Sequence, residues 1–140
     1  MIFVDANCFL RFLSEPITQE DRLNQQRARA LFALARKGEV ELTTSDAILA
    51  EVVFILTNAR HYNGPRTMAA SSLASLLRPR AWRLPAKDVS LHALDLWADR
   101  PELSFPDALA AAHSALRGYE LATFDRALIR APGVITYPFD

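Results

Sequence analysis

Short apolar segments alternate with longer amphipathic segments along the whole sequence, and this alternation limits the possible folds more than any other feature. The apolar segments have the length of strands, whereas the amphipathic segments carry apolar residues at helical spacing. Strands that alternate with helices build a parallel sheet with helices packed on its faces. We therefore predict an α/β fold, a three-layer α/β/α sandwich with a central, mainly parallel sheet.

The boundaries of the predicted elements follow from proline, glycine and capping residues. Pro16 breaks the chain after the first helix, Ser45 can cap a helix, and Gly38 and Gly118 can end two others. The predicted strands are 1–4, 40–43, 82–84, 120–124 and 134–137, and the predicted helices are 8–13, 18–37, 46–59, 66–78, 86–98, 104–117 and 125–129.

Length and composition are those of an ordinary globular domain. The 140 residues are 51% hydrophobic and 23% charged, with 16 basic residues matching 16 acidic ones, and we expect residues 1–140 to form one domain. This balance gives no overall attraction to nucleic acid, so any such contact must be local. Cys8 is the only cysteine, which fits a reducing compartment. With no targeting segment or membrane span recognisable, we expect a cytoplasmic protein.

Two acidic residues directly follow predicted strands. Asp5 comes after the apolar run 1–4, and Asp125 comes after the strand 120–124. Ligands bind at the carboxyl ends of the strands in open parallel sheets, so we expect both carboxylates at that edge. A helix is predicted to follow each acid, so helix capping is the alternative role for both.

Two further acids lie on predicted helices. Glu51 lies on the flank of an apolar stripe, where a buried carboxylate would need an arginine, a hydrogen-bond network or a metal; a structural salt bridge is its alternative role. Asp107 closes the sequence Ser104-Phe105-Pro106-Asp107, which has the pattern of a capping box. Capping alone would explain Asp107, although a first-turn carboxylate can also face the edge of a sheet.

The four acids together suggest one carboxylate cluster. Clustered carboxylates repel one another unless cations or protons balance them. Mg²⁺ and Mn²⁺ prefer oxygen ligands, and such ions promote attack of water on phosphodiesters. The three histidines have no zinc-site spacing, and the glycine-rich nucleotide-binding motifs are absent.

Four short motifs that contain these acids occur in an order that resembles a known family. The motifs are Val4–Asn7, Leu49–Val52, Phe105–Leu109 and Ala122–Arg126, and the segment 130–134 is similar to the closing strand of the same family. Together they resemble a PIN-domain ribonuclease of the VapC toxin type over essentially the whole chain.

The resemblance implies a Mg²⁺- or Mn²⁺-dependent endoribonuclease that serves as the toxin of a toxin–antitoxin pair. It implies metal-site and catalytic roles for Asp5, Glu51, Asp107 and Asp125, with Asn7 and Thr123 as supporting polar groups. Hydrolysis should leave a 5′-phosphate and a 3′-hydroxyl. The implied partners are RNA, a second copy of the chain and a cognate antitoxin, and segments 52–56 and 68–77 are candidate interfaces.

Two departures and two alternatives accompany the resemblance. Relatives often carry an acid at the positions of Ser104 and Ala127, so we expect one tightly bound ion rather than two.

One alternative function is a non-catalytic PIN-like module that binds RNA or protein. The other is a phosphohydrolase with Asp5 as nucleophile, but that chemistry needs a general acid/base where this chain has Asn7.

Overall fold

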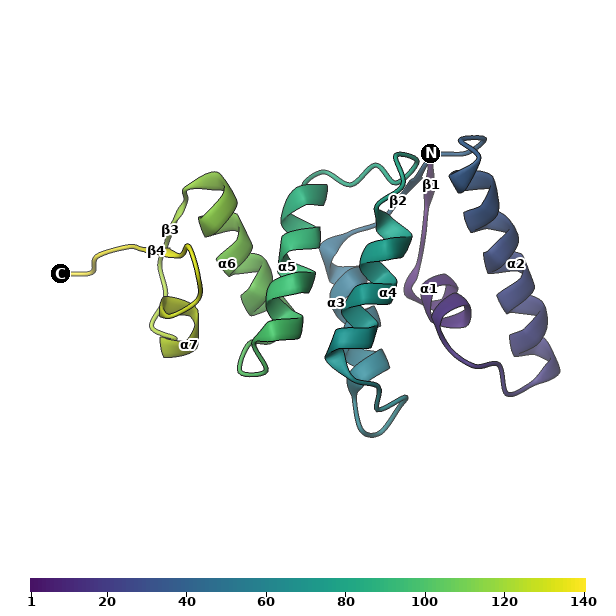
Figure 1. Ribbon diagram of the computed structural model, residues 1–140, viewed down its shortest axis with the longest axis horizontal. Coiled ribbons are helices and arrows are strands. Elements are labelled where there is room, and N and C mark those ends of the chain that lie inside the picture. The colour runs from purple at the N-terminus through teal and green to yellow at the C-terminus, as the bar shows by residue number, and fades with distance from the viewer. The chain divides into compact units, whose positions relative to one another are not determined.

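The computed structural model describes residues 1–140 and divides them into two compact units, residues 1–85 and 86–140 (Figure 1). The N-terminal unit holds β1 (Ile2–Phe3), α1 (Ala6–Leu13), α2 (Gln19–Arg36), β2 (Leu42–Thr43), α3 (Asp46–Thr57) and α4 (Arg66–Leu77). The C-terminal unit holds α5 (Lys87–Asp99), α6 (Phe105–Arg117), β3 (Glu120–Leu121), α7 (Arg126–Ile129) and β4 (Ile135–Thr136).

A parallel pair of strands organises the N-terminal unit. In this pair, Ile2 of β1 lies opposite Leu42 of β2. On the other side of β2, the Arg83 amide donates a hydrogen bond to the Leu42 carbonyl at 2.7 Å. The predicted strand 82–84 is thus reduced to one parallel bridge, and Pro85, which has no amide hydrogen, follows it directly.

Packed aromatic side chains in the core hold α1, α2 and the segment 82–84 together. The Phe9 ring is fully buried and lies 5.3 Å from the Trp82 ring and 6.1 Å from the Phe32 ring, measured between centroids. Phe12 meets Phe32 edge-on at 4.9 Å. Because such pairs add to the free energy of apolar burial, the start of α1 is anchored by the core.

The C-terminal unit is built on the close packing of α5 against α6. Small residues of α6, among them Ala108, Ala111 and Ala112, are fully buried and allow this approach. The second parallel pair joins β3 to β4, with Glu120 opposite Ile135. The buried Ser114 hydroxyl oxygen accepts a hydrogen bond from the Ile135 amide at 2.9 Å, which ties α6 to β4.

The structure is mostly helical, with parallel strands, as the alternation predicts. The sheet is smaller than predicted, because each pair contains two strands of two residues. The first helix starts at Ala6, directly after Asp5, rather than at Cys8. None of the helices combines the length and apolar character required to cross a membrane.

Candidate functional site

Asp5 ends the first strand segment with an exposed carboxylate that has no protein partner. It occupies the N-cap position of α1, yet its side chain makes no capping hydrogen bond, so the capping alternative is wrong for this residue. The backbone of the preceding residue, Val4, is fixed by two hydrogen bonds. The Val4 amide donates to the Thr43 carbonyl at 2.8 Å, and the buried Thr44 hydroxyl donates to the Val4 carbonyl at 2.9 Å. Thr44 directly follows β2 at the same edge and was not predicted from the sequence.

A polar hollow of about 570 Å³ opens beside Asn7, between α1 and α2. Arg11 and Arg27 both line it. Arg11 pairs with Asp21 at 3.4 Å, whereas Arg27 donates a hydrogen bond to the Asn24 carboxamide at 3.3 Å and meets no carboxylate. Arg27 is therefore a cation without a carboxylate partner that lines the same hollow as Asn7, together with the acids Glu20 and Asp21.

Asp5 also influences the thiol of Cys8, one turn along α1. Partial burial and, to a smaller extent, the negative charge of Asp5 raise the pKa of the Cys8 thiol above its usual value. Cys8 also lines the polar hollow.

Glu51 is exposed on α3 and makes no ion pair or hydrogen bond, so the expectation of a partly buried carboxylate is wrong. The buried face of α3 is centred on Leu49, with Val52, Val53 and Leu56 beside it. Glu51 lies roughly 160° from this centre at 100° per residue. Like α1, α3 begins just past the carboxyl end of the β1–β2 pair; Asp5 directly precedes α1, whereas Glu51 lies in the second turn of α3.

Asp107 forms the predicted capping box at the start of α6. The Ser104 amide donates to Asp107 Oδ2 at 3.1 Å, and the Asp107 amide donates to Ser104 Oγ at 3.2 Å. Both predicted hydrogen bonds are confirmed. Capping uses one carboxylate oxygen, so Asp107 Oδ1 keeps no protein partner.

Asp125 caps α7 as its N-cap residue. Its Oδ1 accepts hydrogen bonds from the amides of Ala127 at 2.8 Å and Leu128 at 3.3 Å, whereas Oδ2 has no protein partner. Thr123 Oγ1 accepts a hydrogen bond from the Asp125 amide at 3.0 Å. Thr123 therefore shapes the turn that presents Asp125, and the strand ends at Leu121 because this turn follows it.

The two acids of the C-terminal unit belong to the same end of that unit. From Asp107 to Arg117 the α6 helix rises about 15 Å, and the extended segment 119–125 runs back by about 20 Å. Figure 1 shows the chain leaving the C-terminal end of α6, passing through β3 and reaching α7, which contacts α6. Capping fixes the Asp107 carboxylate at the start of α6 and the Asp125 carboxylate at the start of α7.

The four predicted acids are thus divided between the units, with Asp5 and Glu51 in one and Asp107 and Asp125 in the other. Neither unit by itself gathers three or more His, Cys, Asp or Glu side chains in a group that could hold a metal ion. All four carboxylates carry at least one oxygen without a protein partner.

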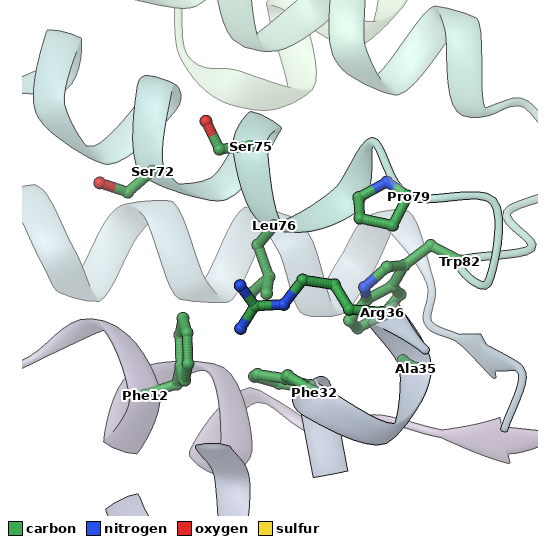
Figure 2. A pocket seen from close by; sticks show the side chains of 9 residues that line it. All are labelled: Phe12, Phe32, Ala35, Arg36, Ser72, Ser75, Leu76, Pro79 and Trp82. Carbon is green, nitrogen blue, oxygen red and sulfur yellow. The ribbon is translucent and has the colours of Figure 1, made fainter. Parts of the chain in front are cut away.

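A second, mainly apolar surface runs along one side of α4. One part of this surface is a hollow of about 170 Å³. In Figure 2 the Arg36 side chain extends over Phe32 towards Phe12 and Leu76. An adjoining hollow of about 230 Å³ near Met68 shares Ser72 with it. We call these two hollows the α4 groove. Glu15 is its only acidic lining residue, so the groove suits binding of a partner better than metal chemistry.

Comparison with known families identifies the class of protein to which the chain belongs. The PIN domain family matches residues 2–134, so the match covers nearly the whole chain and spans both units. The chain belongs to the PIN domain family, whose members are generally nucleases and usually use divalent metal ions. A search of curated proteins finds no significant match.

Proposed function

We propose that the protein is a divalent-metal-dependent endoribonuclease whose active site combines Asp5, Glu51, Asp107 and Asp125. The observation that carries this proposal is the oxygen without a protein partner on each of the four carboxylates, with Asp5, Asp107 and Asp125 at helix starts and Glu51 on the exposed side of α3. In this proposal the chain is a single PIN domain with the three-layer arrangement of the sandwich fold.

The donor set fits a hard divalent cation. Carboxylate oxygens are the ligands that Mg²⁺ and Mn²⁺ prefer, and several carboxylates in one site need cations to balance their charge. When bound, such an ion neutralises charge on phosphate oxygens and makes a bound water a better nucleophile. Asp5, Asp107 and Asp125 would hold it, directly or through water.

The remaining residues orient substrate and water. Glu51, exposed and unpaired on α3, is the group to which we assign metal binding or orientation of the attacking water. Thr123 positions Asp125 through the backbone hydrogen bond described above. Asn7 and Arg27 both line the polar hollow, where we expect them to contact RNA phosphates. Cleavage should leave a 5′-phosphate and a 3′-hydroxyl.

We further propose that the protein is a cytoplasmic VapC-type toxin that forms a homodimer and binds a cognate antitoxin. The α4 groove supports the antitoxin part of this proposal, because it offers an apolar floor on segment 68–77, and Met68 is 66% exposed. Most of segment 52–56 is core, since Val52, Val53 and Leu56 are buried and Phe54 alone is largely exposed.

The proposal is tested by RNA cleavage with Mg²⁺, Mn²⁺ or EDTA. We expect cleavage by the wild type only with metal, strong loss in Asp5→Asn, and wild-type cleavage in the control Asp95→Asn, an exposed acid of α5. Equal cleavage by the Asp5→Asn variant would contradict the proposal. RNA binding without cleavage by the wild type under any metal condition would instead favour the non-catalytic PIN-like module.

A further inference from the structure

Three aromatic rings form an exposed cluster next to Asp125. The Phe124 ring lies 4.7 Å from the Phe139 ring in a stacked arrangement, and Tyr137 meets Phe139 edge-on at 5.1 Å. Phe124 is 82% exposed, Phe139 49% and Tyr137 45%. We call these three residues the aromatic cluster.

The Phe124 ring leaves space on which a further planar group could stack. Phe139 covers part of the Phe124 ring, yet most of Phe124 remains open to solvent. Exposing an aromatic ring forfeits the free energy of its burial, so contiguous exposed rings mark binding surfaces.

Two exposed arginines lie in the segment that follows Phe124 in the sequence. Arg126 directly follows Asp125, and Arg130 caps the C-terminal end of α7; neither makes an ion pair. The acidic residues of segment 124–140 are Asp125, which caps α7, and Asp140, which follows Phe139 in the sequence. Aromatic rings interspersed with cations form the usual surface for single-stranded nucleic acid, in which bases stack and phosphates pair with arginine.

We propose that the aromatic cluster is a stacking platform for an unpaired base of the RNA, adjacent to the bond that is cut. This inference rests on the proposed function, because it places the base beside an active-site acid. Phe124 and Asp125 are consecutive, with their Cα atoms about 3.8 Å apart. A base stacked on Phe124 therefore belongs to a nucleotide close to the phosphate served by Asp125. The substrate at this position is single-stranded RNA.

A tryptophan placed at position 124 tests the proposal without relying on cleavage. The native Trp82 and Trp97 are 2% and 3% exposed, so Phe124→Trp introduces a solvent-accessible reporter. We expect a single-stranded oligoribonucleotide, titrated in EDTA to prevent metal-dependent cleavage, to quench this fluorescence. Tyr119→Trp, at the exposed start of the segment leading to β3, is the control whose emission should stay unchanged.

The affinity of the variants for single-stranded RNA is a second test of the platform. Phe124→Leu keeps an apolar side chain but removes the ring, and it should weaken binding between about 5-fold and 150-fold, whereas Phe124→Trp should bind like the wild type. Arg126→Ala should reduce the slope of log affinity against log salt by about 0.7.

Three outcomes separate the claims. Unchanged affinity in Phe124→Leu would overturn the platform, and a change only in oligomeric state by gel filtration would assign the cluster to a protein interface instead. Quenching in Phe124→Trp and weakened binding in Phe124→Leu, together with a wild type that never cleaves RNA, would support the platform while refuting the nuclease proposal.

Discussion

Substitution of Asp125 can separate helix capping, which the structure shows, from the metal-binding role that we propose for the same side chain. Asp125→Ala removes an acceptor that binds two amides of α7, and loss of an N-cap costs about 1 kcal/mol of folding free energy, within a range of about 0.5–2. Asp125→Asn keeps an oxygen acceptor and removes only the charge, so its stability should change by less than about 0.5 kcal/mol.

The two variants should nevertheless lose RNA cleavage alike. Both remove the charged oxygen that we assign to the metal, and we expect kcat/KM to fall at least about 100-fold, equivalent to about 2.7 kcal/mol of transition-state stabilisation. Urea unfolding and cleavage of a fluorescent single-stranded RNA, measured on the same preparations, give the two quantities. The wild type and Asp95→Asn serve as references.

A different pattern would refute this reasoning. If Asp125→Asn cleaves RNA at the wild-type rate while Asp125→Ala loses stability and activity together, Asp125 acts only as a helix cap. If Asp125→Ala folds as stably as the wild type, the capping hydrogen bonds contribute nothing measurable and the assigned magnitude is wrong.

Three further predictions concern stability. Phe9→Ala should lower the free energy of unfolding by about 3–5 kcal/mol in urea titrations, because the ring is fully buried; a loss below 1 kcal/mol would contradict the packing. Gly133→Ala should lower the thermal midpoint, because Gly133 has φ +76° and a Cβ would lie 2.9 Å from Ala115 Cβ; an unchanged midpoint would refute this. Arg117 donates hydrogen bonds of 2.7 and 2.8 Å to Asp88 and lowers the pKa of Asp88 to about 2, below its unfolded value of about 4, so this stabilisation is present above pH 4 and lost between about pH 4 and 2. Urea midpoints measured from pH 6 to 2 should therefore fall less steeply in Asp88→Asn than in the wild type, and parallel profiles would contradict the assignment.

Local signals in the sequence predicted the helices well. Ser45, Ser104 and Gly118 mark helix ends that depend on nearby backbone groups, and the structure places the ends of α3 and α6 there. The strands were harder to predict, because pairing depends on segments distant in sequence. The predicted strand 120–124 shortens to two residues where Thr123 begins a turn instead.

The candidate site shows the same division between local and distant causes. Capping by Asp107 follows from four consecutive residues and was predictable. The exposure of Glu51 was not, because the buried face of α3 is set by which neighbouring elements pack on it, and that face is centred on Leu49. The aromatic cluster was missed because strand-like residues such as Tyr137 give no sign of exposure until tertiary contacts are known.

The central claim is that acids from the N-terminal and C-terminal units act in one active site, and a double-mutant cycle tests it most directly. Metal-dependent RNA cleavage is measured under single-turnover conditions for the wild type, Asp5→Asn, Asp107→Asn and the double variant. Groups that act as a unit are strongly non-additive, so the double variant should lose no more activity than either single variant. Wild-type cleavage by Asp5→Asn, or losses that multiply in the double variant, would contradict the account.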